Sequence, residues 1–347
     1  MSYLSGKTVL VTGACGTIGR VLVEQILTRH DIAQLIAIDN NETELVFLEE
    51  RWRGRGTRFV LCDIRNLDLL AREARKVDVL FHAAAFKHVN MCERSPMEAV
   101  RTNVIGVQNV VQTAIDNGIR RLIFASTDKA VNPTNVMGAS KLLGEHLVTA
   151  AALDRHQNGA VFLSTRFGNV LGSRGSVIPI FLSQIRAGQA VTITDPRMTR
   201  FIMSADDAVR LLINSGEIGR PGEVLITKMS AVRVGDLAEV IIREAAPLLG
   251  RRAADIETRI VGPRPGEKHY EELMNDEEKR RAEERGNYFV VRPAIWSNEE
   301  SAAAPASATR GITSPYNSDN VEPLTQDQLA RMLHGAGIFD AAKLSMN

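Results

Sequence analysis

Short apolar runs alternate with amphipathic segments along the first half of the chain. The runs are rich in Val, Ile, Leu and Phe and occupy residues 8–12, 35–38, 58–62, 77–82 and 121–126. Between the first two runs, apolar residues at positions 18, 22, 26 and 27 recur at the spacing of one helix face. Nearly continuous apolar strands that alternate with helices are typical of a parallel sheet buried on both faces. The pattern predicts an α/β fold with a doubly wound, Rossmann-type sheet, whose sites gather at the carboxyl ends of the strands.

The pattern loosens after about residue 165, where loops alternate with shorter helices and strands. We therefore expect a sheet domain over residues 1–165 and a smaller α/β domain over residues 166–298, with some segments of the second part returning to the sheet. Residues 299–347 begin with a stretch of small side chains, mainly Ala and Ser. Because such a stretch buries little apolar surface, we expect a carboxy-terminal tail that is partly mobile.

The composition narrows the class of protein. Hydrophobic residues make up 44% and charged residues 24% of the chain, which is an ordinary globular balance. The formal charge of +1 argues against a nucleic-acid partner bound through its phosphates. Three cysteines without a CxxC pair favour a reduced, cytoplasmic protein. The sequence contains neither a signal-peptide pattern nor an apolar run of membrane-spanning length, so we expect no membrane insertion, and the sites below call for no metal.

Three glycines, Gly13, Gly16 and Gly19, lie between the first predicted strand and the first predicted helix. A tight turn, the approach of a backbone to a pyrophosphate, and close helix-to-strand packing each favour a glycine. Thr17 and Ile18 open the helix, whose first N–H groups and positive dipole end can bind a diphosphate. A turn with one packing glycine is the alternative, but the position after a strand and before a helix favours dinucleotide binding.

Polar residues at the ends of the next strands predict the rest of the cofactor site. Asp39 can accept hydrogen bonds from the adenosine ribose hydroxyls and would repel a 2′-phosphate. Because Asn40 adds no cation, we expect NAD rather than NADP. Asp63 and Ile64 end the third strand and are expected at the adenine. The alternative for Asp63 is a cap for the helix expected over residues 66–75.

Small residues follow the fourth predicted strand. Ala83, Ala84 and Ala85 would let the backbone pass close to the cofactor, although small residues also suit any tight strand exit. Lys87 comes next and is either a phosphate or sugar contact or an ordinary surface charge.

The fifth predicted strand leads into Thr127, Asp128 and Lys129, and the following helix contains Met137 and Lys141. With the glycine loop, this order resembles the extended short-chain dehydrogenase/reductase superfamily, in which a Tyr-x-x-x-Lys pair shares one helix face. In that pair the lysine binds the nicotinamide ribose and lowers the pKa of the phenol, so that tyrosine can act as a base. Lys141 matches the lysine. Met137 stands at the tyrosine position and has no ionisable proton.

Longer segments resemble the bacterial polysaccharide-biosynthesis nucleotide-sugar dehydratases, specifically the UDP-N-acetylglucosamine 4,6-dehydratases. The similar segments follow in the same order and occupy residues 83–89, 126–138, 166–170, 173–179, 198–201 and 264–268. The resemblance spans roughly residues 5–295. A methionine at the tyrosine position is typical of the configuration-retaining branch of that family, whereas a C5-inverting branch keeps tyrosine.

The resemblance implies a redox-neutral reaction on UDP-N-acetylglucosamine. NAD takes a hydride from C4, the resulting ketone acidifies the C5 hydrogen, water leaves from C6, and the hydride returns to C6. The product would be UDP-2-acetamido-2,6-dideoxy-α-D-xylo-hexos-4-ulose. By the same resemblance Lys129 is the base at C5, Asp128 is the acid at C6, and Thr127 binds O4. The O4 proton would go to Asp128, which we favour, to a water, or through Thr127, and Met137 would lie beside the sugar or nicotinamide or simply pack in the helix.

Cations in the second half predict the site for the UDP group. Arg264 lies in a loop rich in Pro and Gly and suits a bidentate grip on phosphate. Glu267 could accept from the uridine ribose hydroxyls. Arg174 and Arg200 lie in the segments of resemblance, and Asn169 could bind the sugar or its diphosphate. Each arginine taken alone is more often a surface charge.

Two other functions stay open. A bifunctional dehydratase that also inverts C5 to give the L-arabino product would share these residues, and a catalytically silent NAD-binding sensor would explain the missing tyrosine. A simple 4-epimerase is disfavoured because Asp128 and Lys129 would then have little to do. Helices expected near residues 96–117 and 137–156 resemble those that pair subunits in the superfamily, so we expect a homo-oligomer of two or more chains.

Overall fold

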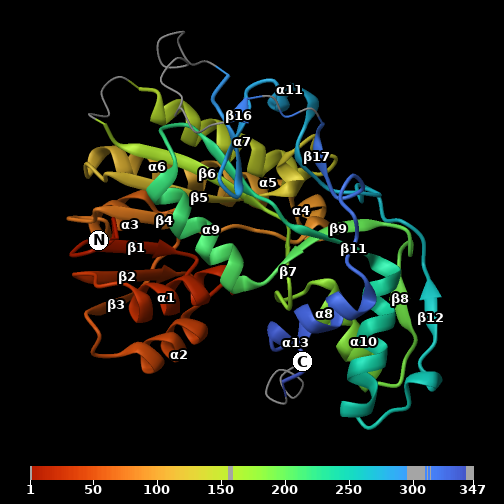
Figure 1. Cartoon of the computed structure of the whole chain (residues 1–347). Coiled ribbons are helices and arrows are strands. Elements are labelled where there is room, and N and C mark those ends of the chain that lie inside the picture. Colours follow the sequence, from red (N-terminus) through yellow and green to blue (C-terminus); the bar gives the residue numbers. More distant parts are fainter. Residues whose placement is uncertain (1, 155–158, 295–308, 311, 313, 341–347) are drawn as a thin grey trace. The chain divides into compact units, whose positions relative to one another are not determined.

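The computed structural model describes residues 2–154, 159–294, 309, 310, 312 and 314–340. Part of the expected tail at residues 299–347, namely residues 299–308, 311, 313 and 341–347, lies outside the described residues. The chain forms two compact units, which are described one at a time (Figure 1). The first contains residues 1–167, 206–228 and 274–315, and the second contains residues 168–205, 229–273 and 316–347.

The first unit is built on a ten-stranded sheet in the order β16-β14-β15-β10-β6-β5-β4-β1-β2-β3. The strands are β1 (Thr8–Thr12), β2 (Gln34–Asp39), β3 (Thr57–Leu61), β4 (Val79–His82), β5 (Arg121–Thr127), β6 (Val161–Phe167), β10 (Val224–Thr227), β14 (Ala282–Arg285), β15 (Tyr288–Val291) and β16 (Thr309–Arg310). The run from β3 to β10 is parallel throughout, and β15, β14 and β16 add antiparallel pairs. The predicted doubly wound α/β sheet is confirmed.

Helices cover both faces of this sheet. The helices of the first unit are α1 (Thr17–Arg29), α2 (Glu42–Trp52), α3 (Leu67–Glu73), α4 (Val89–Arg94), α5 (Pro96–Val100), α6 (Gly106–Asp116), α7 (Val136–Ala152), α9 (Ala205–Ile218) and α11 (Asp276–Lys279), with a π-helical turn η1 (Arg101–Ile105) and a 3-10 turn η2 (Asp128–Ala130). α3, α6 and α7 pack on one face over apolar residues such as Leu80, Leu122 and Phe124, and α1, α2 and α9 cover the other face (Figure 1).

The strand order reverses between β1 and β4, because β1 leads outward through β2 to β3 while β4 starts the return in the other direction. In open α/β sheets, ligands bind beyond the carboxyl ends of the strands at this reversal. The loops after β1, β4 and β5 therefore mark the expected site in the first unit.

In the residues that the structure describes, the second unit combines three small sheets with the α-helices α8, α10 and α13. Its elements are β7 (Asn169–Val170), α8 (Val177–Arg186), β8 (Val191–Ile193), β9 (Thr199–Met203), β11 (Ser230–Arg233), α10 (Val234–Leu248), η3 (Ala253–Asp255), β12 (Thr258–Ile260), β13 (Glu272–Met274), β17 (Tyr316–Asn317) and α13 (Gln326–Gly335). In the three-stranded sheet β9 lies between β11 and β7, and the two other sheets pair β12 with β8 and β13 with β17. A buried cluster from α8, α10 and α13 forms the core of this unit.

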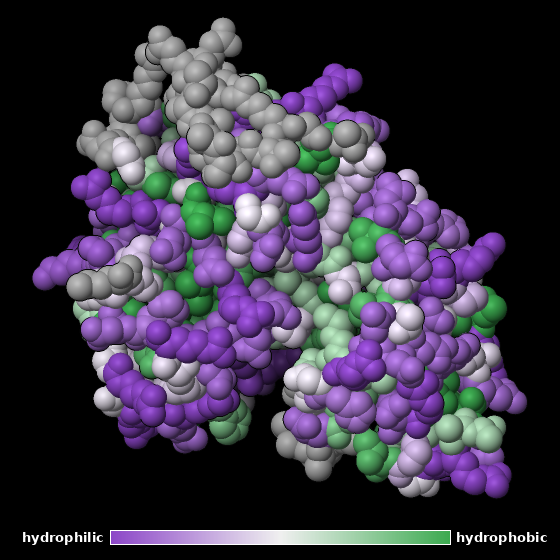
Figure 2. Space-filling model, in the orientation of Figure 1, coloured by the Kyte–Doolittle hydropathy of each residue, from purple (hydrophilic) through white to green (hydrophobic). Residues whose placement is uncertain are grey.

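One part of the tail that was expected to be partly mobile forms a packed helix, α13, in the structure. Leu329 and Leu333 of α13 are fully buried in the core of the second unit. Thr325 begins this helix with a capping box, which the sequence analysis did not use. The surface visible in Figure 2 is mainly hydrophilic, as expected when the apolar side chains fill cores. Among the described helices, none combines the length and the apolarity that crossing a bilayer requires.

Candidate functional site

Different local constraints explain the three glycines of the loop after β1. Gly13 has a φ of 67°, and a Cβ there would lie 2.6 Å from the backbone nitrogen of Ala84. A Cβ on Gly19 would lie 2.0 Å from the carbonyl oxygen of Gly13. Around Gly16 the nearest atom to such a Cβ is a carbonyl oxygen at 3.2 Å, so packing alone does not demand glycine there. Gly16 is the exposed member of the three, where a ligand can approach the backbone.

The start of α1 faces this loop with unpaired donors. Gly16 is the N-cap and makes no side-chain cap hydrogen bond, so Thr17, Ile18 and Gly19 keep the N–H groups that a helix leaves without intrahelical partners. Asp39 at the end of β2 accepts from the backbone N–H of Cys15 and from that of Asn41, each at 2.9 Å. The loop, the helix start and the carboxylate thus form one anion- and hydroxyl-binding edge.

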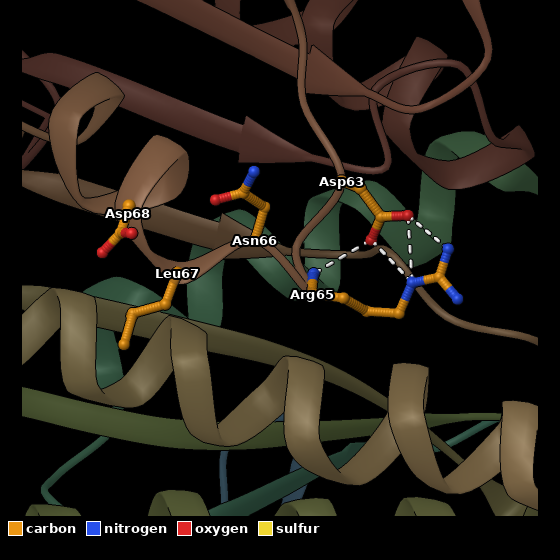
Figure 3. A pocket seen from close by; sticks show the side chains of 5 residues that line it. All are labelled: Asp63, Arg65, Asn66, Leu67 and Asp68. Carbon is orange, nitrogen blue, oxygen red and sulfur yellow. Dashed lines mark hydrogen bonds and ion pairs between the residues drawn. The ribbon is translucent and has the colours of Figure 1, made fainter.

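Asp63 lies in a shallow pocket beyond β3, lined by Asp63, Arg65, Asn66, Leu67 and Asp68 (Figure 3). Its carboxylate accepts from the backbone and the guanidinium of Arg65, which together hold the pKa of Asp63 below its usual range. Asn40 donates to the same carboxylate at 3.4 Å, and Ile64 is buried. The cap of α3 is Asn66, so the capping alternative for Asp63 is wrong.

The backbone after β4 is held by β1. The Oγ1 of Thr12 lies 2.6 Å from Nδ1 of His82 and accepts from the backbone N–H of Ala84 at 3.3 Å. Burial, with the cation of Lys141, lowers the pKa of His82 to about 3, so this ring is neutral. Ala83, Ala84 and Ala85 are half-buried.

Lys87 is exposed, two residues beyond these alanines. Its position leaves both the contact with a ligand and the ordinary surface charge open.

The residues after β5 form a short hydrogen-bonded cluster. Lys129 donates through Nζ to Oδ1 of Asp128 at 3.0 Å, and Thr127 donates through Oγ1 to the same oxygen at 2.8 Å. Asp128 is fully buried, and its Oδ2 has no hydrogen-bond partner among the described residues. Gly138 packs against this turn, because a Cβ there would lie 2.2 Å from the carbonyl oxygen of Lys129.

Met137 and Lys141 share the buried face of α7. Met137 packs with Cys92 and Ala99 in a small apolar cluster, which favours ordinary helix packing for this side chain. Lys141 donates from Nζ to the carbonyl of Ala125 at 2.7 Å and lies 4.0 Å from the centre of the Phe124 ring. Burial lowers the pKa of Lys141 to about 7.

The sequence analysis missed Asn103, which joins the alanine loop to α7. Its Oδ1 accepts from the N–H of Phe86, while its Nδ2 donates to the carbonyl of Phe86 and to Oγ of Ser140. Asn103 is fully buried in the π-helical turn η1. Such turns are rare in proteins overall, but those that occur are often found at functional sites. Asn103 shares its helical segment with Asn109 and Asn117, so nothing in the sequence singled it out.

Arg200 in the second unit holds a loop together. It is 9% exposed, and its guanidinium donates to three backbone carbonyls and one carboxylate. The acceptors are the carbonyls of Thr199, Lys268 and His269 and the carboxylate of Glu267. Because these acceptors occupy the N–H donors of the guanidinium, the structure favours a role for Arg200 in positioning the loop over direct contact with a ligand.

Glu267 closes the turn that carries Arg264. Its Oε2 accepts from the N–H of Arg264 at 3.1 Å, and its own N–H donates to the carbonyl of Arg264 at 3.0 Å. Thr194 donates to the other carboxylate oxygen at 3.3 Å. The Glu267 carboxylate therefore stabilises the loop, while the side chain of Arg264 is exposed.

The remaining two predicted residues also lie in the second unit. Arg174 is exposed before α8, and Asn169 is half-buried at the start of β7. The described residues contain no group of three or more His, Cys, Asp or Glu side chains that could hold a metal ion.

Comparison with known proteins adds to this geometry. A family model described as polysaccharide biosynthesis protein matches residues 9–293. The chain belongs to this polysaccharide biosynthesis protein family. A relative in Methanocaldococcus jannaschii, named an uncharacterized membrane protein, is 47% identical over 84% of this chain and 87% of its own length.

Other relatives carry more specific names. A protein named UDP-glucose 4-epimerase from Rickettsia felis is 36% identical over 94% of this chain and 95% of its own. Among solved structures, Pen from Bacillus thuringiensis has a TM-score of 0.89 and is 36% identical, covering 97% of this chain and 99% of that one. DesIV of Streptomyces venezuelae, a dTDP-glucose 4,6-dehydratase solved with NAD and TYD, has a TM-score of 0.68 at 22% identity, with 94% and 96% covered, and shows the shared fold.

Proposed function

We propose that this chain is an NAD-dependent UDP-N-acetylglucosamine 4,6-dehydratase of the configuration-retaining type. The observation that carries the proposal is the buried Asp128 carboxylate, paired with Lys129 and Thr127 at the end of β5. An epimerase that only exchanges a hydride at C4 has no use for an added acid and base. A dehydratase needs both groups beside one sugar.

The residues of the first unit fit NAD. The exposed Gly16 and the first N–H groups of α1 would bind the diphosphate, Asp39 the adenosine ribose, and Lys141 the nicotinamide ribose. NAD, when bound, accepts the hydride from C4 and returns it to C6. The Asp39 carboxylate and the neutral Asn40 beside it favour NAD over NADP.

Asp128 and Lys129 can divide two proton transfers between them. The proton count balances when the cycle starts with Lys129 as a neutral amine and Asp128 as a carboxylate, with Nζ and Oδ1 3.0 Å apart. The amine of Lys129 takes the C5 proton, and Asp128, once it has received a proton from the substrate, protonates the C6 hydroxyl as it leaves. Lys129 later returns its proton to C5, which restores the starting state.

The O4 proton needs an acceptor because Met137 has none. The Oδ2 of Asp128 is buried without a partner among the described residues and is the acceptor that we favour. A proton taken from O4 during oxidation at C4 is then the proton that leaves with the C6 hydroxyl. Thr127 donates to Oδ1 of Asp128 and in this proposal also binds O4.

The UDP group is assigned to the second unit by charge. Arg264 and Arg174 are exposed cations there, and Asn169 is a further polar candidate. Arg200 and Glu267 position the Arg264 loop in this proposal and are not direct contacts.

A second candidate is UDP-glucose 4-epimerase, the name carried by relatives at 36–39% identity. A third is a dehydratase that also inverts C5. Incubation with UDP-N-acetylglucosamine separates the first two, because dehydration removes one water from the mass and epimerisation leaves the mass unchanged. Proton NMR of the product separates the third, since inversion gives the L-arabino configuration. If no UDP-sugar is turned over while NAD binds, the chain is a sensor and the proposal is wrong.

A further inference from the structure

A buried ion network joins three segments of the first unit that are far apart in the sequence. Arg166 at the end of β6 is 1% exposed. Its guanidinium makes two hydrogen bonds to Glu145 on α7, at 2.9 and 2.7 Å, and two to Glu278 on α11, at 2.9 and 2.7 Å. Both carboxylates are buried and both pairs are bidentate, so each fixes distance and orientation together.

On one side, the network reaches the turn that begins with Asp128 and Lys129. The Oε2 of Glu278 accepts from the N–H of Asn275, the N-cap of α11. Asn275 in turn donates from Nδ2 to Oδ1 of Asn132 at 3.2 Å. Asn132 follows η2 closely and has a φ of +43°, a conformation that a non-glycine residue keeps only when its surroundings fix it.

On the other side, the network reaches Lys141. Glu145 lies one helical turn beyond Lys141 on α7, and its negative charge raises the pKa of Lys141 against the larger, opposite effect of burial. Two carboxylates and one guanidinium leave the network with one net negative charge, which balances the cation of Lys141. Besides the Asp128–Lys129 pair, the elements packed against α7 carry charged side chains at Glu93 and Arg94 on α4, Glu98 on α5, Arg101 on η1, Asp116 on α6 and Arg121 on β5. The neutral His82 on β4 also lies within electrostatic range of Lys141.

We propose that Glu145, Arg166 and Glu278, together with Asn275 and Asn132, are positioning residues for the reaction, aligning the Asp128–Lys129 turn with Lys141 and keeping Lys141 charged. We call these five residues the Arg166 network. Its catalytic meaning rests on the proposed function, but its effect on Lys141 does not.

The same unit contains a matched control. Arg285 on β14 is also held by two buried carboxylates, with hydrogen bonds of 2.8 and 2.9 Å to Glu223 and one of 2.5 Å to Glu283. Glu223 is fully buried, like the carboxylates of the Arg166 network. Within the described part of the chain, the side chains of Arg285, Glu223 and Glu283 form hydrogen bonds neither to α7 nor to the Asp128 turn. Damage to this second network therefore reports general loss of stability.

The first test measures the protonation of Lys141 through NAD binding, with no sugar substrate present. Glu145→Gln keeps the side-chain shape and removes one negative charge beside Lys141. NAD affinity of the full chain, titrated from about pH 5 to 9, should fall as Lys141 loses its proton, and the midpoint should move down by about one pH unit in Glu145→Gln. Glu223→Gln should keep the wild-type midpoint. An unchanged midpoint in Glu145→Gln, or an equal shift in Glu223→Gln, would overturn the proposal.

The second test probes the contact between Asn275 and Asn132 at the other end of the Arg166 network. In Asn275→Asp the side-chain oxygen can still cap α11, but the side chain can no longer donate to Asn132. Turnover of UDP-N-acetylglucosamine should fall by roughly tenfold, while the melting temperature and NAD affinity stay near wild type. Full turnover in this variant would contradict positioning of the turn. A wild-type protein that binds NAD but turns over no sugar would refute the proposed function alone, and the NAD titration would still decide the inference.

Discussion

At the scale of single residues, the proposed chemistry depends on Asp128 and Lys129, each of which carries one proton of the reaction. Lys129→Met removes the base and keeps a side chain of similar length. We expect elimination to fall by at least about a hundredfold, because a positioned acid–base group contributes that much, while NAD stays bound. Exchange of the C5 hydrogen with deuterium oxide, followed by NMR, measures the step directly. Lys228→Met, on an exposed lysine paired with Glu284, serves as the control and should exchange normally.

The buried Lys141 should cost stability in a way that depends on pH. Its pKa is lowered from 10.5 to about 7 in the folded chain, so the unfolded chain binds more protons between these values. The penalty is therefore full below about pH 7 and disappears as the pH rises toward 10.5. Lys141→Met should raise the free energy of unfolding at pH 7 by an amount on the order of 4 kcal/mol.

Denaturant unfolding of Lys141→Met and wild type at several pH values checks this sign. The difference should shrink as the pH rises. A variant that is less stable at pH 7, or a difference that does not change with pH, would contradict the buried, titrating lysine.

Residue-level predictions from the sequence held best where the reason for a residue is local. Gly13 and Gly19 could be predicted because turn geometry and helix packing act over a few residues. The Arg166 network could not, because Arg166 and Glu278 are 112 positions apart and only the fold brings them together. Arg200 and Glu267 are predicted ligand contacts, but they bind each other and the loop backbone, and no local pattern encodes such a tertiary contact.

At the scale of elements, the loop between β1 and α1 offers a test that separates folding from cofactor binding. Gly16→Ala places a methyl group 3.2 Å from the carbonyl oxygen of Gly13, which has to move by only a few tenths of an ångström, so we expect the chain to fold with a small loss of stability. The same methyl group would stand where the diphosphate approaches, and NAD affinity should fall by roughly tenfold or more.

Gly335→Ala, in α13 with open space around it, is the matched control for stability. Isothermal titration with NAD and a thermal melt measure both quantities. Unchanged NAD affinity in Gly16→Ala would remove this loop from the cofactor site.

The predicted strands match β1 to β5 to within a few residues, because buried parallel strands leave continuous apolar runs. The π-helical turn η1 left no such trace. Its one extra residue per turn depends on the buried Asn103 and its partners on α7 and after β4, which no local pattern encodes.

At the scale of the whole molecule, the homo-oligomer stays a prediction, and one exposed apolar surface offers a test of it. Large apolar side chains are exposed on α5, η1 and α7, including Met97 at 61%, Ile105 at 50% and Leu143 at 51%. Leu143→Glu should shift the chain toward monomer in analytical ultracentrifugation, because a buried charge opposes association. Phe47→Glu on α2, where the side chain is 61% exposed, should leave the mass unchanged. An unchanged assembly in Leu143→Glu would move the interface elsewhere.

The path of the chain was the least predictable feature at this scale. The sheet continues through β10, β14, β15 and β16, which the chain adds after passing through the second unit. The sequence analysis predicts that some later segments return to the sheet, but not which strands they pair with. Periodicity identifies a strand but not its neighbours in the sheet.

The fate of the hydrogen on C4 tests the central claim most directly. UDP-N-acetylglucosamine carrying deuterium at C4 is incubated with the protein, and the product is examined by NMR and mass spectrometry. Our account predicts a dehydrated product with the deuterium in its new methyl group at C6. A dehydrated product without the label in that methyl, or a product of unchanged mass with the label still on C4, would contradict it.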